Sequence, residues 1–178
     1  MIYEPEEDSL MLQKHIKDYI KNKSVKVLDL GAGSCILAEE AQKYADNVLA
    51  VDINPEVAEV AKKKNIKFLE SNLFQNPKLK SEKFDLILFN PPYLPALEGE
   101  DEDIKRITTG GKEGHELLEE FLKIVKEHLN KSAKILLICS SLTNNGNVES
   151  LFEKYSFKFK IIDKEDAFFE KIYLYELK

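Results

Sequence analysis

With 178 residues, the chain is long enough for one domain with a hydrophobic core, and we expect residues 1–178 to form a single domain without room for a second, substrate-binding one. Hydrophobic residues make up 43% and charged residues 33% of the chain, and no apolar run reaches the roughly eighteen residues of a membrane span. The start of the chain lacks the features of a secretory or transit signal, so we expect a soluble, cytoplasmic protein. A net charge of −6 disfavours direct nucleic-acid binding.

The cysteine and histidine residues give no sign of a metal site. Cys35 and Cys139 have no Cys or His neighbour at metal-ligand spacing, and we expect both to be reduced, buried thiols. The histidines His15, His115 and His128 show no triad or ligand spacing, so we expect surface or capping roles for them.

Strands and helical stretches alternate along the chain. Apolar residues at helical spacing predict a first helix over 8–21, and the acidic residues before it suit a helix N-terminus. Further helices are expected over 36–44, 54–64 and 113–129. Apolar runs predict strands at Val25–Leu30, Val48–Asp52, Ile66–Leu69, Phe84–Phe89, Lys134–Cys139, Phe157–Ile162 and Ile172–Leu177. This order predicts an α/β fold with a mostly parallel sheet and a C-terminal strand pair; residues 94–112 are its one long irregular stretch.

A glycine turn follows the first predicted strand and opens a helix, which is where a doubly wound sheet binds a nucleotide-like ligand. It reads Asp29-Leu30-Gly31-Ala32-Gly33-Ser34-Cys35. A dinucleotide fingerprint needs a third glycine at position 36, which is Ile36, so a nicotinamide or flavin cofactor is disfavoured. Asp52 ends the second strand and is placed to accept hydrogen bonds from two ribose hydroxyls. The alternative is that Asp29 and Asp52 only cap helices.

Asn90-Pro91-Pro92-Tyr93 ends the fourth predicted strand and indicates the chemistry. A planar NH₂ group attacks a sulfonium methyl only when something holds and polarises it, and the Asn90 side-chain carbonyl and the Pro91 backbone carbonyl could each accept one N–H. The prolines stiffen this backbone, and Tyr93 could stack on the planar group. The alternative is that Pro91-Pro92 simply ends a strand.

With both motifs, the chain resembles the HemK-like glutamine N5-methyltransferases, specifically the short archaeal and eukaryotic branch that modifies class 1 translation termination (release) factors. Three further segments carry the resemblance: Tyr3-Glu4-Pro5-Glu6-Glu7-Asp8-Ser9, Asp52-Ile53-Asn54-Pro55 and Gly110-Gly111-Lys112-Glu113-Gly114. The resemblance implies a class I (Rossmann-like) methyltransferase fold with a seven-stranded sheet, helices on both faces and an antiparallel C-terminal strand. The expected cofactor is S-adenosyl-L-methionine (SAM), and the family's third turn glycine is Cys35 here.

The resemblance also implies site residues and partners. The implied cofactor contacts are Ser9, Asp29, Gly31, Gly33, Asp52, Asn72, Leu73 and Asn90. Asn72 would accept from the adenine amino group and Leu73 would pack on the ring, although Asn72 is equally a turn former. The implied substrate is the glutamine of a Gly-Gly-Gln loop, and a small zinc-binding activator would pair with an edge strand at Ile66–Leu69.

Other activities remain open from the sequence. An exocyclic amine of a DNA or RNA base presents the same planar NH₂, a protein lysine is a further acceptor, and a catalytically idle binding or scaffold subunit would keep the same fold. The acidic run Glu98–Asp103 is expected to be a solvated lid rather than a contact for a basic protein surface. Gly110 and Gly111 are expected to adopt backbone angles that other residues avoid.

Overall fold

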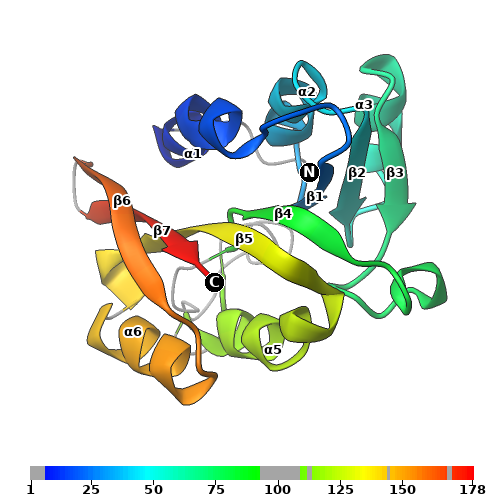
Figure 1. Cartoon of the computed structure of the whole chain (residues 1–178). Coiled ribbons are helices and arrows are strands. Elements are labelled where there is room, and N and C mark those ends of the chain that lie inside the picture. The colour runs from blue at the N-terminus through cyan, green and yellow to red at the C-terminus, as the bar shows by residue number, and fades with distance from the viewer. Residues whose placement is uncertain (1–6, 93–108, 112–113, 144, 168–169) are drawn as a thin grey trace.

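The sheet has seven strands and is mostly parallel. The computed structural model describes residues 7–92, 109–111, 114–143, 145–167 and 170–178. Its strands are β1 (Lys26–Leu30), β2 (Asn47–Asp52), β3 (Lys67–Glu70), β4 (Phe84–Phe89), β5 (Leu129–Ser140), β6 (Phe159–Asp166) and β7 (Lys171–Leu177), in the spatial order β3-β2-β1-β4-β5-β7-β6 (Figure 1). The five strands from β3 to β5 are parallel, and β7 is antiparallel to both β5 and β6. The predicted α/β sheet with its antiparallel C-terminal pair is confirmed.

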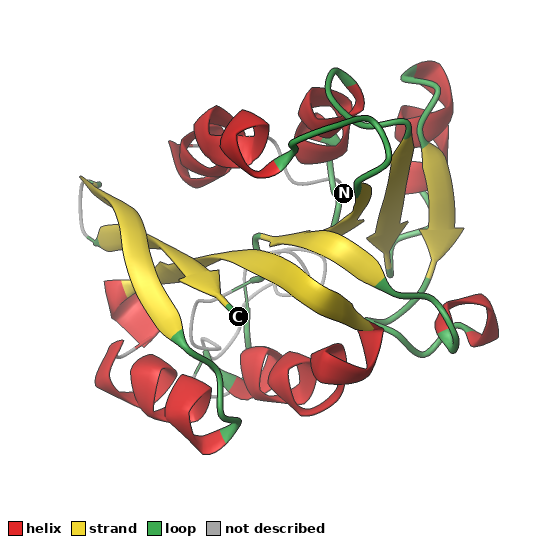
Figure 2. Cartoon of the chain, viewed as in Figure 1, coloured by secondary structure: helices red, strands yellow, loops and turns green. Residues whose placement is uncertain are grey.

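Helices cover both faces of the sheet (Figure 2). They are α1 (Glu7–Tyr19), α2 (Ile36–Gln42), α3 (Val57–Lys63), α5 (Glu116–Ile124) and α6 (Asn145–Lys154), with short 3₁₀ turns at Pro77–Leu79, Val125–His128 and Ser141–Thr143. Helices α1, α2 and α3 pack in one apolar cluster, and α5 and α6 pack in a second.

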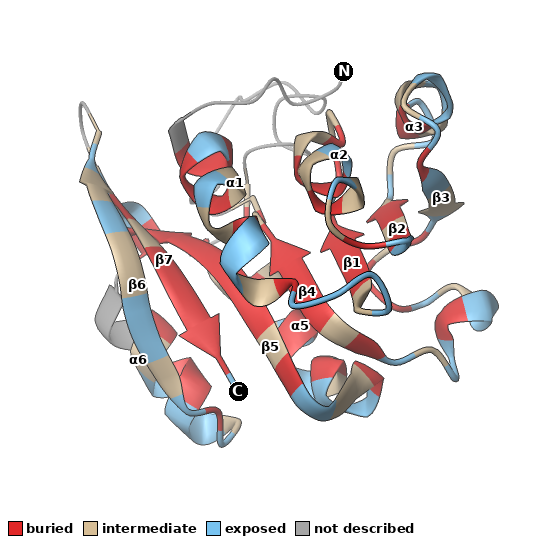
Figure 3. Cartoon of the chain, turned by 45° about the horizontal axis from the view of Figure 1, so that its top comes forward, coloured by how far each residue is buried: buried red, intermediate tan, exposed pale blue. Residues whose placement is uncertain are grey.

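Neighbouring residues of one strand supply the two clusters. Val27 of β1 belongs to the first cluster and Leu28 to the second, because successive side chains of a strand point to opposite faces. Both side chains are fully buried, and Figure 3 shows that the central strands β1, β4 and β5 are mostly buried while β6 is largely exposed or half-buried. This two-sided burial explains why the central strands read as continuous apolar runs.

The second half of the chain departs from the predicted element bounds. The helix expected over 113–129 ends at Ile124, and β5 begins at Leu129 rather than at Lys134. The register between β4 and β5 shifts between Phe84 and Leu86, so the early part of β5 pairs irregularly with β4. The polar residues in this part of β5 show no alternation of apolar and polar side chains, which is why the sequence did not predict a strand there. Helix α6 was not predicted at all, because the turn formers Asn145, Gly146 and Asn147 open it.

The histidine prediction is wrong for His128, which is buried. Its Nδ1 donates to the Glu82 carbonyl oxygen at 3.0 Å, and its ring stacks on Phe74 with centroids 4.1 Å apart. His128 therefore packs in the core beside α5. Cys35 and Cys139 are both buried and free of disulfides, as expected.

The two sheet edges differ in length and composition. β3 is one edge, as predicted, although it begins at Lys67, and Ile66 is buried just before it. β6 is the other edge, and it carries five charged residues among its eight.

Within the described ranges, no helix is both long and apolar enough to cross a membrane.

Candidate active site

The candidate site residues gather at the carboxyl ends of three neighbouring strands. Asp29 lies near the end of β1, Asp52 ends β2, and Asn90 follows β4, with β1 between the other two strands. The register pairs Leu30 with Val51 on one side and with Phe89 on the other. The turn that begins at Gly31 therefore lies between the ends of β2 and β4, as expected for ligand binding in an open parallel sheet.

Backbone hydrogen bonds from β2 hold the glycine turn. The amides of Gly31 and Ala32 both donate to the Val51 carbonyl, at 2.8 and 3.0 Å. Gly31 and Gly33 have φ of +68° and +48°, a region that glycine enters without steric cost. A Cβ added at Gly31 would lie 3.7 Å from the Phe89 ring and 4.0 Å from the Asn90 carbonyl oxygen, so the turn passes close to the start of the Asn90 tetrapeptide.

Cys35 takes the left-handed conformation that a third glycine would adopt more easily. Its φ is +58°, which costs a non-glycine residue about 1–2 kcal/mol. Its side chain is fully buried, and burial raises the pKa of the thiol to about 12. Cys35 is thus a neutral packing residue. Because its backbone still adopts a left-handed φ, the turn keeps its geometry although the third glycine is missing.

Asp29 is fully buried and only half satisfied. Its Oδ2 accepts from the Ala38 amide of α2 at 2.9 Å, whereas its Oδ1 has no hydrogen-bond partner among the described residues. Burial, with a smaller effect from the nearby Asp52 charge, raises the pKa of the Asp29 carboxyl to about 8. A carboxyl in this state favours a cationic ligand, because a positive charge would stabilise its ionised form.

Asp52 supports the local backbone with both oxygens. Its Oδ2 accepts from the Gly33 amide at 2.9 Å and its Oδ1 accepts from the Asn54 amide at 2.8 Å. A carboxylate has about four acceptor positions, so two remain for a ligand. The helix-cap alternative therefore describes Asp29, which accepts from an amide of α2, but not Asp52, because Gly33 and Asn54 lie outside the helices. These contacts leave room for a ligand role at both aspartates.

The segment after β3 reaches the same end of the sheet. The Ser71 amide donates to the Asp52 carbonyl at 2.9 Å, which places Asn72 next to the end of β2. The Asn72 backbone carbonyl accepts from Gln75, so Asn72 opens a turn, and its side chain is half-buried. Leu73 has φ of +46° and is buried with the α5 and α6 cluster.

Asn90 has a fixed side-chain orientation. Its Nδ2 donates to Asp8 Oδ2 and to Ser9 Oγ, both at 3.0 Å, and both partners are buried in the first turn of α1. Its Oδ1 is buried and has no hydrogen-bond partner within the described ranges. Ser9, which was expected to contact the cofactor, contacts Asn90 in this structure. The sequence did not single out Asp8, because acidic residues are common in the first turn of a helix, where they interact favourably with the helix dipole.

The prolines after Asn90 pack against a second glycine segment. Pro91 is buried and Pro92 half-buried, and a Cβ added at Gly110 would lie 2.6 Å from the Pro92 carbonyl oxygen. Gly110 is therefore required for close packing, whereas Gly111 fits the expectation of an unusual backbone angle, with φ of +118°. Tyr93, Tyr3 to Glu6 and the acidic run Glu98–Asp103 lie outside the described residues.

Comparison with known proteins decides the family. The family model described as a methyltransferase domain matches residues 27–109. A Methanocaldococcus jannaschii protein named as a protein N5-glutamine methyltransferase is 37% identical over 179 residues, which cover 96% of this chain and 88% of that relative. The chain belongs to the protein N5-glutamine methyltransferase family. It is accordingly a SAM-dependent methyltransferase, as the glycine turn and the Asn90 tetrapeptide predicted.

Two further relatives agree with this family assignment. The human methyltransferase HEMK2 is 31% identical over 152 residues, which cover 77% of this chain and 71% of HEMK2. A chain of the E. cuniculi Mtq2–Trm112 complex, described as responsible for methylating the translation termination factor eRF1, matches with a TM-score of 0.79 and 22% identity over 99% of this chain and 98% of that chain. The latter likeness shows the class I, Rossmann-like methyltransferase fold.

The site of this N5-glutamine methyltransferase family member suits SAM. SAM carries positive charge on its sulfonium and ammonium groups. The site offers the Asp52 carboxylate and the Asp29 Oδ1, which has no hydrogen-bond partner in the part of the chain that the structure describes. The positive φ angles of Gly31 and Gly33 favour glycine, so at these two positions no side chain would hinder a ligand that approaches the backbone.

Proposed function

We propose that the protein transfers a methyl group from SAM to the side-chain nitrogen of a glutamine in a protein substrate, in the Gly-Gly-Gln loop of a class 1 release factor. The orientation of Asn90 carries this proposal. Both N–H groups of its amide are engaged by Asp8 and Ser9, so only the acceptor oxygen is left for a substrate. This oxygen has no donor among the residues that the structure describes, so it suits an NH₂ donor, and a glutamine side chain supplies one.

The proposed mechanism depends on positioning more than on a strong base. The Asn90 Oδ1 and the Pro91 backbone carbonyl each accept one N–H of the glutamine amide, which holds the nitrogen and increases its electron density. When bound, SAM supplies a methyl group made electrophilic by its sulfonium. With SAM bound, the glutamine nitrogen would form a bond to that carbon as the carbon–sulfur bond breaks, and the methylated amide would then lose one N–H proton to solvent. Alignment of this kind contributes on the order of 7–11 kcal/mol.

The cofactor would be held by the strand ends. We assign the Asp29 carboxylate to the ammonium group, the Asp52 carboxylate to the ribose hydroxyls, and the backbone of Gly31 and Gly33 to the close approach of the ligand. Asn72 would accept from the adenine amino group with Leu73 beneath the ring, and Ser9 would lie at the methyl end, where it contacts Asn90. Pro92 and Tyr93 complete the proposed catalytic tetrapeptide. The buried Asp29 Oδ1, for which the described residues supply no hydrogen-bond donor, supports this arrangement.

Methylation of alternative acceptors tests the function. The protein is incubated with methyl-labelled SAM and either a release factor, the same factor with the loop glutamine changed to glutamate, or nucleic acid. We expect label only in the glutamine-bearing factor, with mass spectrometry placing one methyl group on that side chain. Label in nucleic acid or on a lysine would replace the glutamine proposal with one of those acceptors.

Asn90→Ala separates catalysis from cofactor binding. This variant removes one preorganised acceptor, and loss of one such hydrogen bond at a reacting group lowers kcat by about 10²-fold or more. We expect the SAM dissociation constant to change by no more than about threefold, which is under 1 kcal/mol. An unchanged kcat would mean that the oxygen does not hold the substrate. If neither wild type nor the variant transferred methyl groups, the catalytically idle subunit would be favoured instead.

We further propose that a small zinc-binding protein pairs with the edge strand β3. Two observations support this edge over β6. β3 is short and presents the half-buried side chains of Phe68 and Leu69. β6 carries five charged residues, which disfavour pairing with a further strand at that edge. The matched Mtq2 chain forms a complex with Trm112, which supports the existence of such a partner.

Co-purification from the native source identifies the partner, and amide hydrogen exchange locates it. Pairing along an edge protects backbone amides that were exposed. We expect slower exchange in Lys67–Glu70 and unchanged exchange in Phe159–Asp166 when the partner is added. Protection of β6 alone, or of neither strand, would contradict the proposed edge.

A further inference from the structure

Helix α1 reaches the catalytic tetrapeptide through two residues of its first turn. Asp8 and Ser9 are 2% and 4% exposed, and both accept hydrogen bonds from the Asn90 amide nitrogen at 3.0 Å. The contact joins segments 82 and 81 residues apart in sequence. Such a contact is costly to form unless both partners are held, because each side chain loses rotamer freedom.

The structure holds the Asp8 carboxylate from a second direction. Asp8 Oδ1 accepts from the Ser9 backbone amide at 2.5 Å while Oδ2 faces Asn90. Asp8 is also the second residue of α1, where the positive end of the helix dipole favours a negative charge. The carboxylate is therefore fixed and stabilised in the position that Asn90 requires.

An ionised carboxylate determines which way the Asn90 amide points, because it accepts hydrogen bonds and cannot donate them. Rotation of the amide by half a turn would place Oδ1 against Asp8 Oδ2, two acceptors in contact. The Ser9 hydroxyl alone would not exclude this rotation, since a hydroxyl both donates and accepts. Asp8, more than Ser9, thus keeps Oδ1 directed away from α1.

We infer that Asp8 is a positioning residue for methyl transfer: it orients the Asn90 amide and, by accepting a charge-assisted hydrogen bond from Nδ2, makes Oδ1 a stronger acceptor. This inference rests on the proposed function of Asn90. Donation from Nδ2 to an anion shifts electron density through the amide toward its oxygen, and hydrogen bonds linked in this way strengthen one another. The Oδ1 atom has no other partner among the described residues to supply that polarisation.

Asp8→Asn tests the inference with little change in shape. An asparagine at position 8 cannot accept from both the Ser9 amide and Asn90 without turning its own NH₂ toward one of them. We expect kcat on the glutamine substrate to fall about 10- to 100-fold, the scale of a hydrogen bond to a charged group, with the SAM dissociation constant within about threefold of wild type. A kcat within about twofold of wild type, or a loss of SAM affinity as large as the loss of kcat, would overturn the inference.

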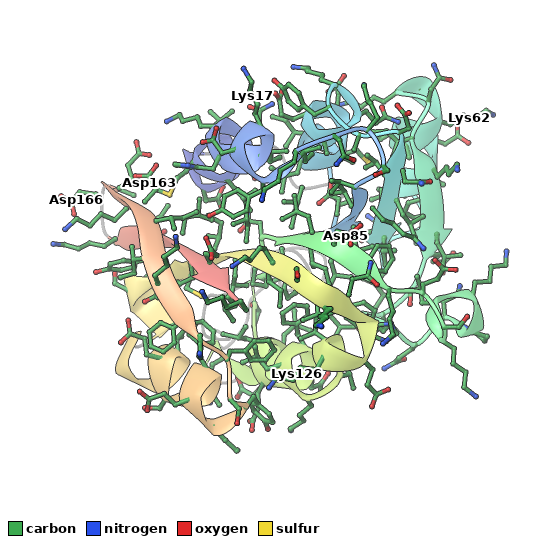
Figure 4. All side chains as sticks on the ribbon, viewed as in Figure 1. Lys17, Lys62, Asp85, Lys126, Asp163 and Asp166 are labelled. Atoms are coloured by element: carbon green, nitrogen blue, oxygen red, sulfur yellow. The ribbon has the colours of Figure 1, made fainter. Side chains whose placement is uncertain are left out.

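The matched control is Asp163→Asn, the same chemical change at another contact of α1. Asp163 lies on β6 (Figure 4) and its Oδ2 is 2.8 Å from His15 Nε2 of α1. This variant weakens the attachment of the helix without touching Asn90, so we expect wild-type kcat with a slightly lower Tm. If Asp163→Asn lowers kcat as much as Asp8→Asn, general loosening of α1 is the cause and the positioning role is wrong.

A substrate-free spectrum separates this inference from the proposed function. The side-chain NH₂ of Asn90, assigned by its disappearance in Asn90→Ala, is followed by ¹H–¹⁵N NMR. We expect its protons to move upfield in Asp8→Asn, because the charge-assisted hydrogen bond is lost, and not in Asp163→Asn. If wild type methylates no glutamine but the resonance responds in this way, the proposed substrate fails and the positioning contact stands.

A second variant covers the case in which Asp8→Asn does not fold. Ser9→Ala removes the neutral acceptor and leaves the carboxylate, and charge-assisted hydrogen bonds are about twice as strong as neutral ones. We expect a smaller loss of kcat and a still downfield Asn90 resonance. A loss in Ser9→Ala of about 100-fold or more, with an upfield resonance, would assign the orienting role to Ser9 instead.

Discussion

The Asp52 side chain accepts a hydrogen bond from the Gly33 amide at 2.9 Å, so the end of β2 holds the turn that follows β1. This contact spans 19 residues of sequence and lies at the proposed ribose site. Under the proposed function, one carboxylate makes both a structural contact and a ligand contact. Substitution of Asp52 changes both, and the two effects differ in measurable ways.

Asp52→Asn should weaken cofactor binding more than it slows turnover. The amide side chain of this variant would keep one acceptor oxygen and would turn its NH₂ group toward the backbone N–H of either Gly33 or Asn54. It would also offer fewer acceptor positions to the ribose hydroxyls. We expect the SAM dissociation constant to rise by about 10-fold or more, the value of one or two hydrogen bonds to a charged group, with kcat at saturating SAM reduced less. Calorimetric titration beside steady-state kinetics checks this. A larger effect on kcat than on binding would place Asp52 at the reacting atoms.

The pKa of Asp29 predicts how SAM binding depends on pH. Burial raises the pKa of this carboxyl to about 8, so the ligand-free protein carries a proton there at neutral pH. The cationic ligand favours the carboxylate, so binding releases that proton and affinity rises with pH up to about 8. Above that value the α-amino group of SAM loses its own proton, so affinity should peak near pH 8. Titration in buffers of different ionisation enthalpy measures the proton released; none at neutral pH would contradict the prediction.

Asp29→Asn should stabilise the ligand-free protein while it impairs binding. The folded pKa of about 8 exceeds the unfolded value of 3.8, so the folded state binds more protons between these values and its stability falls as pH rises through that window. The variant lacks this penalty. We expect its Tm advantage over wild type to be small near pH 4, to grow toward pH 8 and then to level off. The exposed-site variant Asp46→Asn should show a Tm difference that stays flat over the same range.

Much of the site could be predicted from sequence because its residues are local to motifs. Asp29, Gly31, Gly33 and Asp52 follow strands whose apolar runs are clear, and parallel strands bring their carboxyl ends together whatever the rest of the chain does. The structure placed each of these where the pattern indicated. Their ligand contacts stay predictions.

The residues that the sequence did not reveal depend on contacts between distant segments. Asp8 meets Asn90 across 82 positions, and an acidic residue in a first helical turn has an ordinary explanation without that contact. His128 is buried because its ring stacks on Phe74, which no local pattern indicates. Gly110 is needed for the approach of Pro92, whereas the sequence suggested an unusual backbone angle.

Glu176 should contribute a part of the stability that is lost in acid. Its carboxylate accepts from Tyr19 of α1 at 2.6 Å and from Lys134 at 2.8 Å, with Lys160 at 3.1 Å. Burial alone would raise its pKa, but the hydrogen bonds from Lys134, Tyr19 and Lys160 outweigh that effect and lower the pKa to about 2. Because the folded pKa lies below the unfolded value of 4.5, this stability is present above pH 4.5 and is lost as the pH falls toward 2.

The variant Glu176→Gln measures that contribution. We expect it to lower the free energy of unfolding at neutral pH by about 1–3 kcal/mol, because two lysines lose their buried carboxylate. The gap between variant and wild type should narrow steadily below pH 4.5, as followed by denaturant unfolding. A gap that stays constant down to pH 3 would show that the carboxylate is not held in its charged form. kcat at neutral pH should change little, since Glu176 lies at the far end of α1 from Asp8.

Gly110→Ala should disturb the tetrapeptide through the backbone. The added Cβ would meet the carbonyl oxygens of Pro92 and Gly114, and neither is the flexible end of a side chain. Overpacking of this kind costs about 1–3 kcal/mol, which corresponds to a Tm lower by roughly 2–12 °C for a protein of this size. The movement falls on Pro92, two residues from Asn90, so we expect kcat to fall at least about 10-fold even for the fully folded variant.

Gly111→Ala provides the comparison, because its strain lies elsewhere. At Gly111 the added Cβ would meet the Glu116 side chain, and the φ of +118° strains any other residue. This variant should therefore lose a similar amount of stability and keep a kcat closer to wild type at a temperature where both variants are folded. Equal kcat values for the two variants would show that the Gly110–Pro92 contact does not position the tetrapeptide. A lower kcat for Gly110→Ala alone is the result that this packing predicts.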